Sequence, residues 1–152
     1  MDNSSELEAN NIIVRLLAIR EYSLYELRQR LQQIGFTEAI ADTALEKAVE
    51  AGWQSDERYA LALIRSRIGR LHGPAKIRAE LRQKGVHASM AEQCLQELTP
   101  DWEAMALEYI SRNSRYHQAP LKARQALHRR GYDSAQINHA LREWATSSAG
   151  AD

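Results

Sequence analysis

Residues that commonly carry out catalysis or bind metal ions are sparse in this sequence. Five histidines occur, and none has the spacing of a metal-ligand set. Cys94 is the only cysteine. The sequence also lacks a glycine-rich phosphate loop and a nucleophile elbow. We therefore expect a protein that is not an enzyme and that uses no cofactor or metal ion.

The lone cysteine excludes an intrachain disulfide, which favours a reducing compartment. No stretch approaches the roughly 18 apolar residues that a membrane helix needs, and the first residues lack the pattern of a secretory signal. We therefore expect a cytoplasmic protein with no membrane partner. Cys94 stands where the repeats described below have Ala44 and Ala140, so we expect a small core residue and not a reactive thiol.

The uneven distribution of charge along the chain is the feature that most clearly indicates a binding function. Lys plus Arg and Asp plus Glu both number 20, yet the first 50 residues hold 5 basic and 9 acidic ones. From Arg65 to Lys84 there are seven basic residues against Glu80 alone, and from Arg112 to Arg130 six basic residues and no acid. Such windows create positive fields that attract polyanions. The alternative is that they are solvated helix faces, as most basic runs are.

These basic windows belong to an internal repeat. Three glycines, Gly35, Gly85 and Gly131, lie 50 and 46 residues apart, a period typical of helical repeat proteins. Each glycine follows a leucine by four residues and an arginine by seven. The leucines are Leu31, Leu81 and Leu127, and the arginines are Arg28, Arg78 and Arg124. We expect the leucines to be buried at equivalent points, because residues four apart share one face of a helix.

The sequence pattern of each copy predicts three helices, and the second helix ends at the glycine. Helix starts are predicted at a capping box formed by Ser23 and Glu26, at Pro74 and Pro120, and at Ser55, Thr99 and Asp133. The third helix of the second copy is expected to begin near Ser89. No run has the alternating pattern of a β-strand.

The fold prediction is an all-α protein in which three tandem three-helix repeats form an elongated, curved helical array. One such unit is too small to bury a full core, so neighbours must stack. The predicted segments are a flexible N-terminus (1–11), repeat 1 (12–51), repeat 2 (52–99), repeat 3 (100–145) and a flexible C-terminal tail (146–152).

Several stretches of the chain resemble the RecX family of recombination regulators. They are Leu17–Ser23, Gly52-Trp53, Asp56–Ala60, Ser66-Arg67, His72-Gly73-Pro74 and Lys84-Gly85-Val86, together with Ile77 and Leu81. The resemblance covers roughly residues 12 to 144 and is strongest from 52 to 86. The third copy departs from it, because Tyr116–Pro120 stands where the second copy has Arg70–Pro74.

This resemblance implies that the partner is the RecA recombinase filament on single-stranded DNA. We expect the protein itself to be a monomer. Family members bind in the groove of that filament, inhibit its recombinase, ATPase and coprotease activities, and so modulate recombination, DNA repair and the SOS response. Direct contact with single-stranded DNA is expected to be weak and non-specific. A nucleoprotein partner suits a neutral protein with local basic faces.

The predicted partner- and DNA-binding residues lie in the two basic windows. They are Arg65, Arg67, Arg70, Lys76, Arg78, Arg82, Lys84, Lys122, Arg124, Arg129 and Arg130. Arg78 and Arg82 lie one helical turn apart on the flank of the apolar stripe and could grip phosphate or an acidic protein surface. The alternative is that an arginine at this position packs its stem on a neighbouring repeat and pairs its head with a carboxylate. The two alternatives are equally weighted for Arg28.

Two other functions are open at this stage. The first is a non-specific DNA-binding module, since helix, turn and helix superficially resemble a helix-turn-helix. Against sequence-specific binding, the third helices carry few groups that reach a base edge, as in Glu38–Thr43 and Ser89–Gln93. The second is a helical scaffold that binds only protein.

Overall fold

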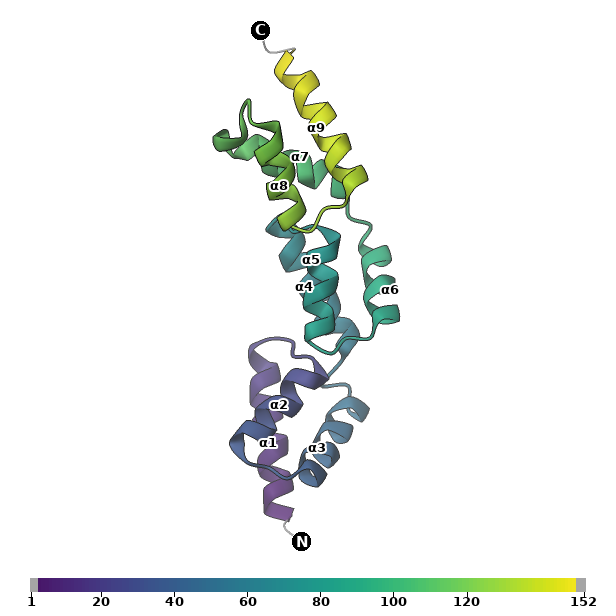
Figure 1. Ribbon diagram of the computed structural model, residues 1–152. Helices are drawn as coiled ribbons and strands as arrows, with labels where there is room; N and C mark the ends of the chain where they lie inside the picture. The colour runs from purple at the N-terminus through teal and green to yellow at the C-terminus, as the bar shows by residue number, and fades with distance from the viewer. Residues whose placement is uncertain (1–2, 150–152) are drawn as a thin grey trace. The chain divides into compact units, whose positions relative to one another are not determined.

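The structure, a computed structural model, describes residues 3–149, and within this range it is entirely helical with no strand (Figure 1). This confirms the all-α prediction, with nine α-helices and one short 3₁₀ turn among the described residues. The helices are α1 (Asn3–Ile19), α2 (Leu24–Ile34), α3 (Glu38–Glu50), α4 (Asp56–Gly69), α5 (Pro74–Gln83), α6 (Ala88–Leu98), α7 (Trp102–Arg112), α8 (Pro120–Arg129) and α9 (Ser134–Ala149). None of the described helices is long and apolar enough to cross a membrane.

The chain divides into two compact units, and the division falls inside the three middle helices. The first unit comprises the residues up to Leu63 together with Leu81–Cys94. The second comprises Ile64–Glu80 and the residues from Leu95 onward. The glycine turns of the second and third repeats therefore lie in different units, Gly85 in the first and Gly131 in the second.

The first unit is built around α1, α2 and α3. Its core consists of small and aliphatic residues, namely Ala9, Ile13, Leu27, Leu31, Ala41, Ala44, Leu45 and Ala48. Half of these side chains are alanines, which allow α3 to lie close to α1 and α2. The Asp56 carboxylate at the start of α4 accepts a hydrogen bond of 2.9 Å from the Leu24 N–H, so α4 satisfies a free donor at the start of α2.

The second unit has a larger and more aromatic core. Its buried members are Leu71, Met105, Ala106, Ile110, Tyr116, Ala123, Ala126, Leu127, Tyr132, Ile137 and Ala140. Trp102, the first residue of α7, and Trp144 of α9 pack against this cluster. The Tyr132 hydroxyl donates a buried hydrogen bond of 2.7 Å to the Leu71 carbonyl, which ties the start of α9 to the end of α4.

The predicted buried positions are confirmed. Leu31, Leu81 and Leu127 are each 0% exposed, and Cys94 is buried at 1%. The side chain at the leucine position therefore faces the core in all three copies, as the four-residue spacing predicted.

Most predicted helix starts are confirmed as well. Ser23 and Glu26 form both bonds of a capping box, and Asp133 does the same with Gln136 at the start of α9. Pro74 and Pro120 are the first residues of α5 and α8. The Ser55 hydroxyl accepts a bond from the Arg58 N–H before α4.

Three helix starts differ from the prediction. The start predicted at Thr99 is wrong by about two residues, because α7 begins at Trp102 and the Asp101 carboxylate caps the Ala104 N–H. Helix α6 begins at Ala88, one residue before the predicted Ser89, since the His87 ring nitrogen accepts the Ser89 N–H. Helix α1 begins at Asn3, nine residues before the predicted first unit.

The predicted flexible ends are therefore shorter in the structure. Ala9, buried in the first core, lies within the segment 1–11 that was predicted to be flexible. At the other end α9 continues through residues 146–149. The rest of both predicted segments, residues 1–2 and 150–152, lies outside the described residues.

Candidate interface for nucleic acid and protein

The repeated arginine links the second helix of a repeat to the third. Arg28 forms an ion pair with Asp42, and Arg124 donates a 2.8 Å hydrogen bond to the Asn138 side-chain oxygen. Both partners lie fourteen residues after their arginine. Arg78 holds the same repeat position on α5, and its side chain is engaged as well. Arg28 thus pairs with a carboxylate, as in the alternative to partner binding given above, although the carboxylate belongs to its own repeat.

Two more predicted residues, Arg67 and Lys84, pair with carboxylates. Arg67 forms a two-pronged pair with Glu80, with N–O distances of 2.7 and 2.5 Å, which joins α4 to α5. In the first unit the Lys84 ammonium lies 3.7 Å from the Glu26 carboxylate. Both cations are only partly exposed, and a carboxylate already balances the charge of each. They are therefore less available to a partner molecule than unpaired cations.

Arg130 holds the turn between α8 and α9 against the end of α4. Its guanidinium donates hydrogen bonds to the carbonyls of Arg70 and Leu71 and lies 4.3 Å from the centre of the Tyr109 ring. The end of a helix carries unpaired carbonyls with partial negative charge, which a cation stabilises. Arg130 therefore has a structural function at this turn.

The turn at Gly131 brings the two basic windows together. The Gly73 N–H donates to the Arg130 carbonyl at 2.7 Å, and the Ala75 N–H donates to the Gly131 carbonyl at 3.0 Å. A Cβ atom on Gly131 would lie 2.5 Å from the backbone nitrogen of Lys76, and one on Gly73 would lie 2.4 Å from the carbonyl carbon of Gly131. Only glycine at both positions permits this approach, which places Lys76 beside the α8–α9 turn.

Burial and the surrounding positive charges both disfavour the charged form of His72. Burial, followed by the charges of Lys76, Arg130 and Arg67, lowers its pKa from 6.5 to about 4. The imidazole is therefore neutral at pH 7 and adds no positive charge to the surface. A second positive group is disfavoured here because the basic residues around it already outweigh the nearby Glu80.

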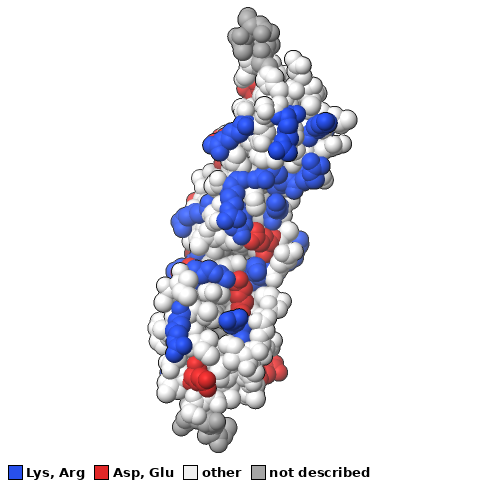
Figure 2. Space-filling view, turned by 90° about the vertical axis from the view of Figure 1, so that its left-hand side faces the viewer, with Lys and Arg blue, Asp and Glu red and all other residues white. Residues whose placement is uncertain are grey.

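Six of the predicted residues are exposed and form no ion pair within residues 3–149. They are Arg65, Arg70, Lys76, Arg82, Lys122 and Arg129. All except Arg82 belong to the second unit. Figure 2 shows Lys and Arg side chains gathered over the upper, C-terminal part of the face that it draws, with few carboxylates among them.

Two of these cations occupy unusual positions. Lys76 and Lys122 are each the third residue of their helix, α5 and α8, and neither helix has an acidic residue in its first turn. Repeat 1 has Glu26 at the same place in α2. The N-terminus of a helix carries partial positive charge, so a lysine there is unfavourable for folding. Lys76 and Lys122 therefore add positive charge where the helix end is already partly positive.

The described residues contain no group of three or more His, Cys, Asp and Glu side chains that could hold a metal ion. The contacts between side chains were the part of the site that sequence reasoning missed. One signal was present, because Asp42, Glu92 and Asn138 all follow the repeated arginine by fourteen residues. Nothing in the sequence indicates the bond from Arg130 to the end of α4.

Comparisons with known proteins agree with this architecture. Family models for the first and second three-helix domains of RecX match residues 9–47 and 55–95. The regulatory protein RecX of Chromohalobacter salexigens is 34% identical over 143 residues, covering 91% of this chain and 94% of the relative. RecX of Vibrio parahaemolyticus is 32% identical over 140 residues, covering 89% and 90%.

Solved structures show the same fold. The crystal structure of RecX from Lactobacillus salivarius matches with a TM-score of 0.82 at 18% identity, over 93% of this chain and 97% of that one. A second crystal structure of regulatory protein RecX matches with a TM-score of 0.80 at 23% identity, over 88% and 71%. From the extent and identity of these matches, the chain belongs to the RecX family of regulatory proteins.

Proposed function

We propose that this protein binds the RecA filament on single-stranded DNA and inhibits its recombinase, ATPase and coprotease activities. Membership of the RecX family supports the proposal, because its relatives are named regulatory proteins. The exposed lysines and arginines of the second unit supply the charge that a nucleoprotein attracts. In this proposal the protein acts in the cytoplasm, where it modulates recombination and DNA repair.

The observation that carries the location of the site is the pair of lysines at the third positions of α5 and α8. Lys76 and Lys122 are exposed, form no ion pair among residues 3–149, and lie where the helix dipole disfavours a cation. Phosphate oxygens of the bound strand are the partners that we assign to them. We assign phosphate oxygens also to Arg65, Arg70 and Arg129, which lie in the same second unit.

Replacing both lysines by glutamate tests this assignment. Glutamate at the third helix position is favourable, as Glu26 illustrates in α2, so Lys76→Glu/Lys122→Glu is expected to keep its helix content. The concentration needed to inhibit DNA-dependent ATP hydrolysis by RecA is expected to rise at least about tenfold, which corresponds to about 1.4 kcal/mol. Wild-type affinity should also fall with added salt, with a log–log slope of roughly −0.7 per phosphate neutralised.

The matched control makes the same change of charge in the acidic first unit. Arg15 and Arg30 are exposed and form no ion pair within residues 3–149. Arg15→Glu/Arg30→Glu is therefore expected to inhibit within about twofold of wild type, which is about 0.4 kcal/mol. Inhibition by the lysine variant at wild-type concentrations would refute the location, and no inhibition by wild-type protein would refute the function.

A further inference from the structure

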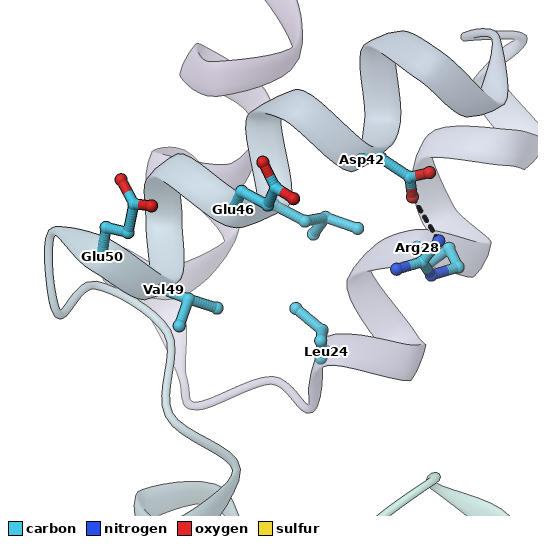
Figure 3. A pocket seen from close by; sticks show the side chains of 7 residues that line it. Leu24, Arg28, Asp42, Glu46, Val49 and Glu50 are labelled. Carbon is cyan, nitrogen blue, oxygen red and sulfur yellow. Dashed lines mark hydrogen bonds and ion pairs between the residues drawn. The ribbon is translucent and has the colours of Figure 1, made fainter.

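We infer that the groove between α2 and α3 is a docking site for a basic segment of a partner protein that presents an aliphatic side chain. The groove lies in the first unit and has a volume of about 470 Å³. Its lining residues are Leu24, Arg28, Asp42, Leu45, Glu46, Val49 and Glu50 (Figure 3). The volume lies in the range of sites that accept compact ligands or a few side chains.

The groove has an apolar floor that is open to solvent. Leu45 is buried at 2%, Leu24 is partly buried, and Val49 is 46% exposed. Figure 3 shows the side chains of Leu24 and Val49 facing the space between the two helices. An aliphatic side chain of a partner would cover Val49 and remove apolar surface from water.

The charges around this floor select a cation. Three carboxylates line the groove against one cation, and that cation, Arg28, is paired with Asp42. Glu46 and Glu50 are exposed and form no ion pair within residues 3–149. They follow Asp42 at successive intervals of four residues, a like-charge arrangement that is unfavourable for α3. A lysine or arginine of a partner would relieve this repulsion, whereas phosphate would add to it.

The third repeat shows that this charge does not come from the fold. A pocket of about 380 Å³ also lies between its second and third helices, α8 and α9. Arg124, His128 and Arg129 line it, together with the apolar Ile137. The corresponding helices thus form an acidic groove in repeat 1 and a basic one in repeat 3. The partner of the first groove is therefore a cationic protein segment and not nucleic acid.

The test is an NMR titration of the ¹⁵N-labelled full chain with a synthetic peptide, acetyl-Lys-Leu-Leu-Lys-Lys-Leu-Leu-Lys-amide. Chemical-shift changes are expected at the amides of Leu24, Leu45 and Val49. The peptide in which glutamate replaces each lysine is expected to cause only weak changes at these amides. In Glu46→Lys/Glu50→Lys the affinity is expected to fall at least tenfold. In the control Glu8→Lys/Glu97→Lys, which changes the same charge at exposed sites outside the groove, it is expected to stay within twofold.

Three outcomes would overturn the inference. The first is that the glutamate peptide shifts the same amides as strongly, and the second is that Glu46→Lys/Glu50→Lys keeps wild-type affinity with unchanged helix content. The third is that the protein sediments as a dimer that dissociates in Glu46→Lys/Glu50→Lys, since a second copy would then occupy the groove. None of these measurements uses RecA, so their outcome is independent of the proposed function.

Discussion

Substituting alanine for Gly131 tests the close contact that joins the basic windows of the second unit. Gly131 has a φ of +98°, and its Cβ would lie 2.5 Å from the Lys76 nitrogen and 2.7 Å from the Lys76 Cβ. A left-handed conformation costs an alanine about 1–2 kcal/mol. Forcing an extra methyl group into a packed contact costs a further ~1–3 kcal/mol. The free energy of unfolding is therefore expected to fall by about 2–5 kcal/mol.

Two matched substitutions separate these contributions. Gly35 has a φ of +114° with no atom within 4 Å of its Cβ position, so Gly35→Ala isolates the conformational cost of about 1–2 kcal/mol. Gly73 is not in the left-handed region, but its Cβ would lie 2.4–2.6 Å from backbone atoms of Gly131 and Tyr132. Gly73→Ala therefore isolates the steric cost. The entropy that alanine removes from the unfolded chain is common to all three variants and cancels in the comparison.

The assay is urea unfolding followed by circular dichroism and tryptophan fluorescence, together with amide hydrogen exchange at Gly73 and Ala75. These two amides donate to the carbonyls of Arg130 and Gly131. They are expected to exchange faster in Gly131→Ala and to be unchanged in Gly35→Ala. The reasoning is refuted if Gly131→Ala costs no more than Gly35→Ala and leaves the two amides equally protected.

Three further predictions concern the core, the pH dependence and the basic flank. Leu81→Ala is expected to lower the free energy of unfolding by about 2–5 kcal/mol, whereas Leu121→Ala, at a residue 68% exposed, should cost little, as thermal melts would show. The folded His72 resists protonation above about pH 4 and the unfolded one accepts a proton near pH 6.5, so stability should decline as pH falls between these values. His72→Gln should remove that part of the decline in urea titrations at pH 7 and pH 5. Arg78→Glu/Arg82→Glu should weaken inhibition of RecA ATP hydrolysis, and full inhibition would show that this flank is not in contact with the filament.

Local signals explain how much of the fold could be predicted from the sequence. Ser23 with Glu26, Pro74 and Pro120 start helices through chemistry confined to one turn, so their positions were predictable. The start of α1 at Asn3 was not, because its first turn is polar and Ala9 is the first of its residues in the core cluster. Ala9 is buried against residues of α2 and α3, and such contacts between helices give no signal in the local sequence.

The site was less predictable, because its geometry depends on pairs of residues far apart in the chain. Arg67 lies in the same basic window as Arg65, and Arg130 in the same window as Arg129. Yet Arg67 pairs with Glu80, and Arg130 donates to the carbonyls that follow the end of α4. The sequence locates the basic windows, but it does not distinguish basic side chains that are paired within the fold from those that face solvent. That distinction needs the partner of each side chain.

The way in which each repeat starts its second helix affects which residue can occupy the third position of that helix. Repeat 1 uses a capping box, in which a side-chain oxygen of Glu26 accepts the Ser23 N–H. Although burial opposes it, hydrogen bonds from Arg20 and Ser23 and the nearby charges of Arg20 and Lys84 hold the pKa of Glu26 below its usual value. Repeats 2 and 3 start with proline, which has no N–H to satisfy and is preset for the helix. The third position is then released from capping, and it holds Lys76 and Lys122. A family of repeats with one framework can thus carry an acidic first unit and a basic second unit.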